Sequence, residues 1–268
     1  SEKCREDSQV LYHQTEKLVL SECKLDIWSP KHQLSFVRHY FDTKQSERID
    51  AEYYQPKYNE IIAVIKNYKG GWDIIKNQFK LNKSSFNIIQ GNMYNYLEIS
   101  GVNVLNGEID IINVQASELP VNAKIKLEKG NLVVSRVRTY RGAVAIIDRN
   151  SIIGSGAFTV LQENGVINKE TLLVLLKSLP YSQLSLKFSR GTSYPVLMDK
   201  DILNFPIPIF EKQFQNKVVD NISFSIKLLQ KSNALLEIAK KSVEMAIELD
   251  ESIAEKWINE ELKKIQKN

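Results

Sequence analysis

Arginine and tyrosine side chains that could bind a polyanion are concentrated in one short stretch of this chain. Residues 135–142, SRVRTYRG, lie at a turn between two predicted strands and carry Arg136, Arg138, Tyr140 and Arg141. A guanidinium group can donate two parallel hydrogen bonds to a guanine edge or a phosphate, and a tyrosine between arginines can stack or pack on a sugar. An exposed, charged strand edge explains such a cluster about as often. The stretch is therefore a candidate DNA contact, and an exposed, charged strand edge is the alternative.

A second loop, residues 189–194, repeats this mix of side chains. Its candidate DNA-contacting residues are Arg190, Thr192, Ser193 and Tyr194. Lys83, in a stretch of lysine, serine and asparagine, is a third and weaker candidate, for which a solvated loop is the commoner explanation. Two polar loops at the ends of strands or helices fit the readout of a DNA groove better than one loop would.

Signatures of catalysis and of cofactor or metal binding are missing from the sequence. It has neither a phosphate-binding G-x-x-x-x-G-K-[ST] loop nor an H-E-x-x-H motif. The glycines of residues 154–156, GSG, lie in a strand-like run and are more typical of a bulge than of a cofactor loop. Cys4 and Cys23 lie near the three histidines, but at spacings that match no zinc pattern. We therefore expect a non-catalytic protein with no cofactor and no metal.

The composition agrees with an ordinary soluble protein of one or two domains. Of 268 residues, 43% are apolar and 25% are charged. The net charge of +4 permits a polyanionic partner without requiring one. Two cysteines do not make a disulfide framework, which favours a reducing cytoplasm. The longest apolar runs, such as residues 172–176, fall far short of the ~20 residues that span a bilayer, so we expect no membrane association.

The candidate loops are predicted to sit in an α+β domain with a small twisted sheet. A helix is expected to begin near Pro56 and to end at Gly70 and Gly71. Short runs rich in valine and isoleucine, separated by glycines, predict strands, with further helices on either side. The predicted strands are residues 96–104, 108–114, 123–127, 131–137, 143–148 and 151–161, and the further helices are residues 73–81, 169–179 and 182–188.

The last quarter of the chain predicts a long helix that pairs with another helix. After Pro208 there is no glycine or proline. An unbroken helix over residues 211–267 would be about 85 Å long. An asparagine at one a position is typical of a coiled coil with a specified register, although a long helix of an ordinary bundle is the alternative. The predicted pairing residues at a and d positions are Val219, Ile222, Ile226, Leu229, Asn233, Leu236, Val243 and Ile247.

A helix over residues 7–25 is also predicted, and it shares residues with the end of the long helix. Aligning residues 12–26 with residues 236–250 gives identities at Lys17/Lys241, Val19/Val243, Leu25/Leu249 and Asp26/Asp250. This weak similarity is expected if residues 7–25 are the end of an earlier copy of the same helix.

Several motifs, in this order, resemble the DNA-specificity subunit of type I restriction-modification enzymes. They are DAEYYQPKY (50–58), YLEISGVNVLNGEID (96–110), KGNLVVSRVRTYRGAVAII (129–147), RGTSYPVL (190–197) and FPIPIFEKQ (205–213) before a long helix.

The resemblance implies a target-recognition domain over residues 51–208 and a coiled-coil spacer helix over 209–268. Residues 1–26 would form an N-terminal helix, which could be the end of a preceding spacer. Residues 27–50 would form a linker. The implied partners are double-stranded DNA, methyltransferase subunits and a restriction and translocase subunit. Because the chain starts at Ser1 with one such domain, we expect a fragment of a two-domain subunit or a half-length subunit, with its helix pairing with a second copy or second half. A coiled-coil scaffold whose globular domain binds another protein is the alternative.

Overall fold

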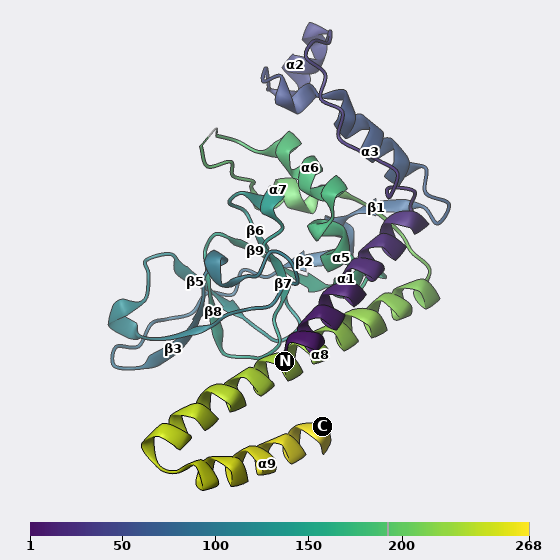
Figure 1. Cartoon of the computed structure of the whole chain (residues 1–268). Helices are drawn as coiled ribbons and strands as arrows, with labels where there is room; N and C mark the ends of the chain where they lie inside the picture. Colours follow the sequence, from purple (N-terminus) through teal and green to yellow (C-terminus); the bar gives the residue numbers. More distant parts are fainter. Residues whose placement is uncertain (192, 268) are drawn as a thin grey trace. The chain divides into compact units, whose positions relative to one another are not determined.

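The computed structural model describes residues 1–191 and 193–267 and has the predicted α+β class (Figure 1). The chain divides into two compact units. The globular unit comprises residues 16–218, and the helical unit comprises residues 1–15 and 219–268. The globular unit is wider than the expected domain of residues 51–208. The boundaries predicted within it stay predictions.

Two four-stranded sheets form the centre of the globular unit. The first sheet is antiparallel and has the order β2 (Phe79–Leu81), β9 (Phe158–Glu163), β6 (Leu132–Ser135) and β7 (Val144–Ile146). The second sheet has the order β4 (Ile112–Gln115), β3 (Met93–Leu97), β8 (Ile152–Ser155) and β5 (Ala123–Leu127), with β3 and β8 parallel. A further pair joins β1 (Trp72–Ile74) to β10 (Pro206–Pro208).

One apolar core connects the two larger sheets. It includes Val133 and Val160 from the first sheet, and Leu97, Leu127 and Ile152 from the second. All five side chains are buried, which explains why these short strands read as runs of valine, isoleucine and leucine. The core therefore holds the ends of the strands, and the turns between them, in defined positions.

The predicted strand over residues 151–161 is two strands, β8 and β9, joined by a turn at Gly156. The amide of Gly156 donates to the Asn122 carbonyl. A Cβ atom on Gly154 would lie 2.8 Å from a methyl group of Leu127, so the glycine lets β8 and β5 approach closely. These glycines thus serve chain packing and a turn.

Helices cover the sheets and carry the loop of residues 189–198. Pro56 opens α3 (Pro56–Lys66), and the Asn168 side chain caps α5 (Lys169–Lys177) by accepting from the Thr171 amide, both as predicted. The other helices are α4 (Ile75–Gln78), α6 (Leu179–Phe188) and α7 (Asp199–Leu203), with short 3-10 turns η1 (Glu52–Tyr54), η2 (Ile99–Gly101), η3 (Ala116–Glu118) and η4 (Thr139–Arg141).

The helix predicted over residues 73–81 is wrong. That segment contains the end of β1, one turn of α4 and all of β2. The strand pairings of β1 with β10 and of β2 with β9 replace the helical hydrogen bonds, and a single-sequence pattern cannot show such distant partners.

Residues 27–50, predicted as a linker, form an arm that contains the short helix α2 (Tyr40–Ser46). No residue of α2 is buried. Two reciprocal hydrogen bonds fasten the arm to Gln55, the residue between η1 and α3: the Gln33 amide donates to the Gln55 side chain at 3.0 Å, and that side chain donates to the Gln33 carbonyl at 2.9 Å. The arm is thus attached by backbone and side-chain polar contacts more than by a buried face.

The helical unit contains parts of α1 (Glu2–Glu22) and α8 (Lys212–Glu248), together with α9 (Glu251–Lys267). Ser8 Oγ lies 2.8 Å from the Ser225 carbonyl oxygen, and Ser232 Oγ lies 2.8 Å from the Ser1 carbonyl oxygen. Since the partner number on α8 falls as the number on α1 rises, the two helices run antiparallel. Both pairs are seven residues apart, the spacing of a heptad.

The expectation of one unbroken helix to residue 267 is wrong. Helix α8 ends at Glu248, and α9 begins at Glu251 and turns back beside α8, where Lys241 Nζ lies 5.1 Å from the Trp257 ring centroid (Figure 1). A carboxylate oxygen of Asp250 accepts from the Ser252 amide, so Asp250 caps the new helix. This cap is a local signal that the apolar periodicity of the segment concealed.

The residues predicted to pair along α8 are buried to very different extents. Ile222 and Leu229 are buried, Val219, Ile226 and Asn233 are half-buried, and Leu236, Val243 and Ile247 are exposed. Their role in pairing stays a prediction. Among the described residues, no helix is both long enough and apolar enough to cross a membrane.

Candidate nucleic-acid interface

The two loops predicted separately as DNA contacts lie side by side. Val137 forms a β-bridge with Val196, which also bridges Arg190. The Leu197 amide donates to the Arg136 carbonyl, and the Arg138 amide donates to the Pro195 carbonyl. Residues 136–141 and 189–198 therefore form one continuous surface, which we call the recognition surface.

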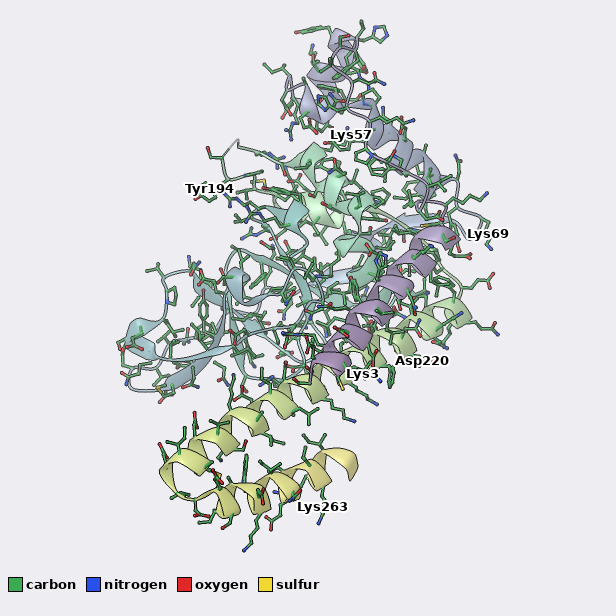
Figure 2. The ribbon with its side chains drawn as sticks, in the orientation of Figure 1. Lys3, Lys57, Lys69, Tyr194, Asp220 and Lys263 are labelled. Carbon is green, nitrogen blue, oxygen red and sulfur yellow. The ribbon has the colours of Figure 1, made fainter. Side chains whose placement is uncertain are left out.

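Arg138 contacts the other loop through both its backbone and its side chain. Its backbone is left-handed, with φ of 49°, a conformation that non-glycine residues rarely adopt. Its Nη2 donates to the Ser193 carbonyl at 3.3 Å, and its guanidinium carbon lies 4.4 Å from the centroid of the Tyr194 ring. Tyr194 itself is 66% exposed, at the outside of the loop that follows α6 (Figure 2). Arg138 is thus half-buried and lies over the ring of the exposed Tyr194.

Arg136 is partly committed to the protein. Its Nη2 donates to the Gly156 carbonyl, and its Nε lies 3.7 Å from a carboxylate oxygen of Asp199. The same Asp199 oxygen accepts from Thr159 Oγ1 at 2.7 Å. These contacts hold Arg136 against the turn between β8 and β9.

Arg190 is committed more strongly, to Asp201. Both terminal nitrogens of Arg190 donate to the Asp201 carboxylate, which is buried and also accepts from the Met198 amide at 2.8 Å. This bidentate ion pair holds Arg190 against α7. It leaves fewer donors of Arg190 for a base.

Side chains of α5 and α6 hold the turn that carries Tyr140 and Arg141. Ser182 Oγ donates to the Tyr140 carbonyl at 2.6 Å. Lys177 Nζ donates to the carbonyls of Val104 at 2.8 Å and Gly142 at 3.0 Å. The Arg141 side chain is exposed, and no contact of it with another side chain is present in residues 1–191 and 193–267.

The remaining candidates are separate or undescribed. Ser193 is exposed on the recognition surface. Lys83 precedes Ser85, which bridges Ile125 of β5, and no contact joins it to either loop in the described part of the chain. Thr192 lies outside the described residues.

Sequence reasoning missed the residues that shape this surface, namely Asp199, Asp201, Lys177 and Arg48. Arg48, in the arm, binds Asp50 through two 2.8 Å hydrogen bonds and donates to the Ser189 carbonyl at 2.9 Å. Each of these residues also contacts a distant segment, and a local pattern does not show such a partner. The one signal in the sequence was that two aspartates, Asp199 and Asp201, follow Arg190 within eleven residues and could form an ion pair with it.

A groove of about 860 Å³ runs between the arm and the recognition surface. The arm contributes residues 46–50, and the opposite wall contains Arg190, Pro195 and Lys200. Within residues 136–141 and 189–201, five side chains are positive and two are negative. The arrangement can hold a polyanion by charge and present an arginine–tyrosine pair to it.

No group of three or more histidine, cysteine, aspartate or glutamate side chains that could hold a metal is found in the ranges that the structure describes.

Comparisons with known proteins give structural neighbours. No protein-family model matches this chain, and no curated protein matches it significantly. One similar solved structure, from work on assembly and conformational transition of the type I R-M system, is 22% identical, covers 65% of this chain and 46% of its own, and has a TM-score of 0.49.

Two further solved structures are S subunits. The HsdS subunit from Thermoanaerobacter tengcongensis is 17% identical, with 66% of this chain and 49% of that chain covered and a TM-score of 0.47. The type I restriction-modification S subunit from M. genitalium is 17% identical, with 71% and 50% covered and a TM-score of 0.45. The match thus spans about half the length of these solved chains. The first and third of these structures are described as belonging to type I restriction-modification systems.

Proposed function

We propose that this chain is a non-catalytic reader of DNA sequence in a type I restriction-modification complex. The observation that carries the proposal is the convergence of two arginine- and tyrosine-containing loops, 136–141 and 189–198, into one surface beside an open groove. Phosphate contacts would supply affinity and a steep salt dependence, while base-edge contacts would supply the choice of sequence. One recognition surface corresponds to one half of a split target.

The helical unit supports a docking role for α8. In this proposal a second stripe of apolar residues on α8 faces the methyltransferase subunits, and it comprises Phe224, Leu228, Leu235, Ile238 and Met245. Phe224 is 57% exposed, and the other four are half-buried. Methyl transfer, ATP use and cleavage belong, in this proposal, to those subunits and to a restriction and translocase subunit.

Pairing with a second copy or a second half has support from the repeated segment. Val19 and Leu25 are buried, whereas their aligned counterparts Val243 and Leu249 are exposed. Apolar side chains that are covered in one copy of a repeat and uncovered in the other favour a missing neighbour. A second chain, or a second recognition domain, would supply that neighbour.

The direct test is a binding selection. This chain, with a cognate methyltransferase subunit, is incubated with random DNA duplexes at near-physiological salt, and the retained duplexes are sequenced. Enrichment of a short defined motif supports the proposal, and a symmetric pair of motifs adds support for dimerisation. Failure of the folded, subunit-bound chain to enrich any motif would sink the proposal.

A protein-binding scaffold is the second candidate. It is favoured by exposed apolar side chains in the arm, among them Leu34 and Val37, each more than nine-tenths exposed. This candidate predicts that substituting the arm abolishes a protein interaction while DNA binding is absent in the unsubstituted chain. The same selection therefore separates the two functions.

A further inference from the structure

A second hollow lies in the globular unit, beside the groove. It has a volume of about 410 Å³ and lies between the arm, the start of α3 and the end of α6. We call it the arm hollow. Its lining residues include Arg38, Gln45, Tyr53, Asn59 and Lys187.

Two cations from distant parts of the sequence meet there. Arg38 Nη2 donates to the Tyr54 carbonyl at 2.9 Å. Lys187 Nζ donates to the Tyr53 carbonyl at 2.7 Å and lies 4.0 Å from the centroid of the Tyr53 ring. A guanidinium group has five N–H donors and an ammonium group has three, so both retain donors.

The positive charge of these groups is poorly compensated. In the described part of the chain, neither Arg38 nor Lys187 forms an ion pair with a carboxylate. Burial, followed by the nearby charges of Arg38 and Arg48, lowers the pKa of Lys187 to about 8. The neighbouring Asp50 is already paired with Arg48. Asp42 is the one carboxylate among the lining residues that the structure describes, and it forms no ion pair with Arg38 or Lys187 there.

Neutral donors complete the lining. Gln45 and Asn59 are exposed, and neither side chain makes a hydrogen bond to the protein within the described ranges. Amide groups with free N–H donors beside two cations are the partners that a phosphate oxyanion uses.

The arm hollow adjoins the groove that the recognition surface lines. Ser46 lines both the arm hollow and the groove that Arg190 lines. A polyanion lying in the groove therefore passes the edge of the arm hollow.

We propose that the arm hollow binds a backbone phosphate of the DNA duplex whose bases face the recognition surface, through Arg38 and Lys187. This inference rests on the proposed function, since it assigns a phosphate contact of the same DNA complex. A guanidinium fork suits a phosphate, and an ammonium group adds a point charge. The contact fixes the register of the duplex and carries no sequence information.

The test compares Arg38→Gln, Lys187→Gln and the double variant with the unsubstituted chain in its methyltransferase complex. Binding to the selected duplex and to a scrambled duplex is measured over a range of salt concentrations. We expect equal weakening on both duplexes, and a slope of log affinity against log salt that is smaller by about 1 for each lost contact. The selected motif stays the same.

Matched controls separate a local charge from a general one. Lys76→Gln removes an exposed lysine of α4, and Arg149→Gln removes an arginine that is paired with Asp148. In both controls the slope of log affinity against log salt should change less than it does in the Arg38 and Lys187 variants. Arg38→Lys should keep the slope, and thermal unfolding of each variant checks that the fold is retained.

The outcomes are distinct. An unchanged slope in the double variant, with the motif still selected, overturns the phosphate site and leaves the proposed function standing. A changed motif makes the arm a base reader and also overturns it. Stabilisation of the folded chain by inorganic phosphate alone, lost in the double variant while the DNA slope is unchanged, identifies a free phosphate in place of the DNA backbone. A chain that enriches no duplex fails the proposed function and the site together.

Discussion

The guanidinium carbon of Arg138 lies 4.4 Å from the ring centroid of Tyr194. The two residues belong to different loops, and the hydrogen bond from the Arg138 amide to the Pro195 carbonyl holds the loops together at this point. Stacking on an aromatic ring orients a guanidinium group and leaves its edge free to donate. Tyr194 therefore orients the guanidinium group of Arg138.

The first prediction concerns the coupling of this pair. Arg138→Ala and Tyr194→Ala should each weaken binding of the selected duplex, and the double variant should weaken it by less than the sum. We expect a coupling energy of about 0.5–2 kcal/mol. Arg141→Ala is the matched control, since its side chain is exposed on the same turn, and it should be additive with Tyr194→Ala. Additivity of the Arg138 and Tyr194 substitutions would contradict a shared role.

The second prediction concerns Arg190 and Asp201. Because Asp201 is buried and binds both terminal nitrogens of Arg190, Asp201→Ala should lower the free energy of unfolding by roughly 1–3 kcal/mol. Arg190→Ala should weaken binding to all duplexes similarly, because the loop shifts. A relaxed motif in the selection with Arg190→Ala would instead make Arg190 a base contact.

The third prediction is a pH dependence that arises from Lys177. Burial lowers the pKa of Lys177 from 10.5 to about 7, with the opposing charge of Glu16 acting in the other direction. Between these two values the unfolded chain binds more protons than the folded chain, so stability rises with pH in this window and is lost as pH falls towards 7. The slope is at most about 1.4 kcal/mol per pH unit from one group.

Denaturant unfolding between pH 7 and pH 10 measures that slope. Lys177→Met should reduce it, whereas Lys76→Met, at an exposed position, should leave it in place. Since Lys187 also has a lowered pKa, a smaller slope is expected to remain in the Lys177 variant. An identical slope in Lys177→Met and the unsubstituted chain would assign the dependence elsewhere.

The fourth prediction concerns the contact between α1 and α8. Ser8 Oγ donates to the Ser225 carbonyl, and Ser225 Oγ donates to the Ser8 carbonyl at 3.0 Å, so the helices approach closely at small side chains. Ser225→Leu should destabilise the helix pair by about 1–3 kcal/mol through overpacking. Ser223→Leu, at an exposed position of α8, is the control and should have little effect in urea unfolding monitored by helical circular dichroism.

The fifth prediction concerns the two thiols. Burial raises the pKa of Cys23 to about 12, so Cys23 should resist a thiol reagent at pH 8 in the folded chain. Cys4 is half-buried and should be modified first. Mass spectrometry should find one modification under native conditions and two in denaturant. Fast modification at Cys23 would indicate that the end of α1 opens.

Local signals in the sequence predicted several elements well. The strand of residues 123–127 has its predicted bounds, Pro56 opens α3, and Asn168 caps α5. Each depends on groups within a few residues, such as a fixed φ of proline or a side chain that accepts from a nearby amide. Asp250 belongs to the same class, although its cap was hidden in an apolar pattern.

Elements that depend on distant partners could not be predicted in this way. Residues 72–81 became two strand segments and a helical turn because β10 and β9 lie beside them. The exposure of Val243 and Ile247 likewise depends on which helices are present as neighbours. A periodic pattern reports which face is apolar, and it does not report what covers that face.

By itself, the sequence determined the α+β composition, the residue types of the two candidate loops and the long C-terminal helix. Only the tertiary structure decided that the bridge between Val137 and Val196 joins those loops, and that Arg190 is satisfied by Asp201 while Arg138 is presented by Tyr194. The physical reason is that hydrogen bonds and stacking act over a few ångströms, so the free donors of an arginine depend on which distant segments the fold brings beside it.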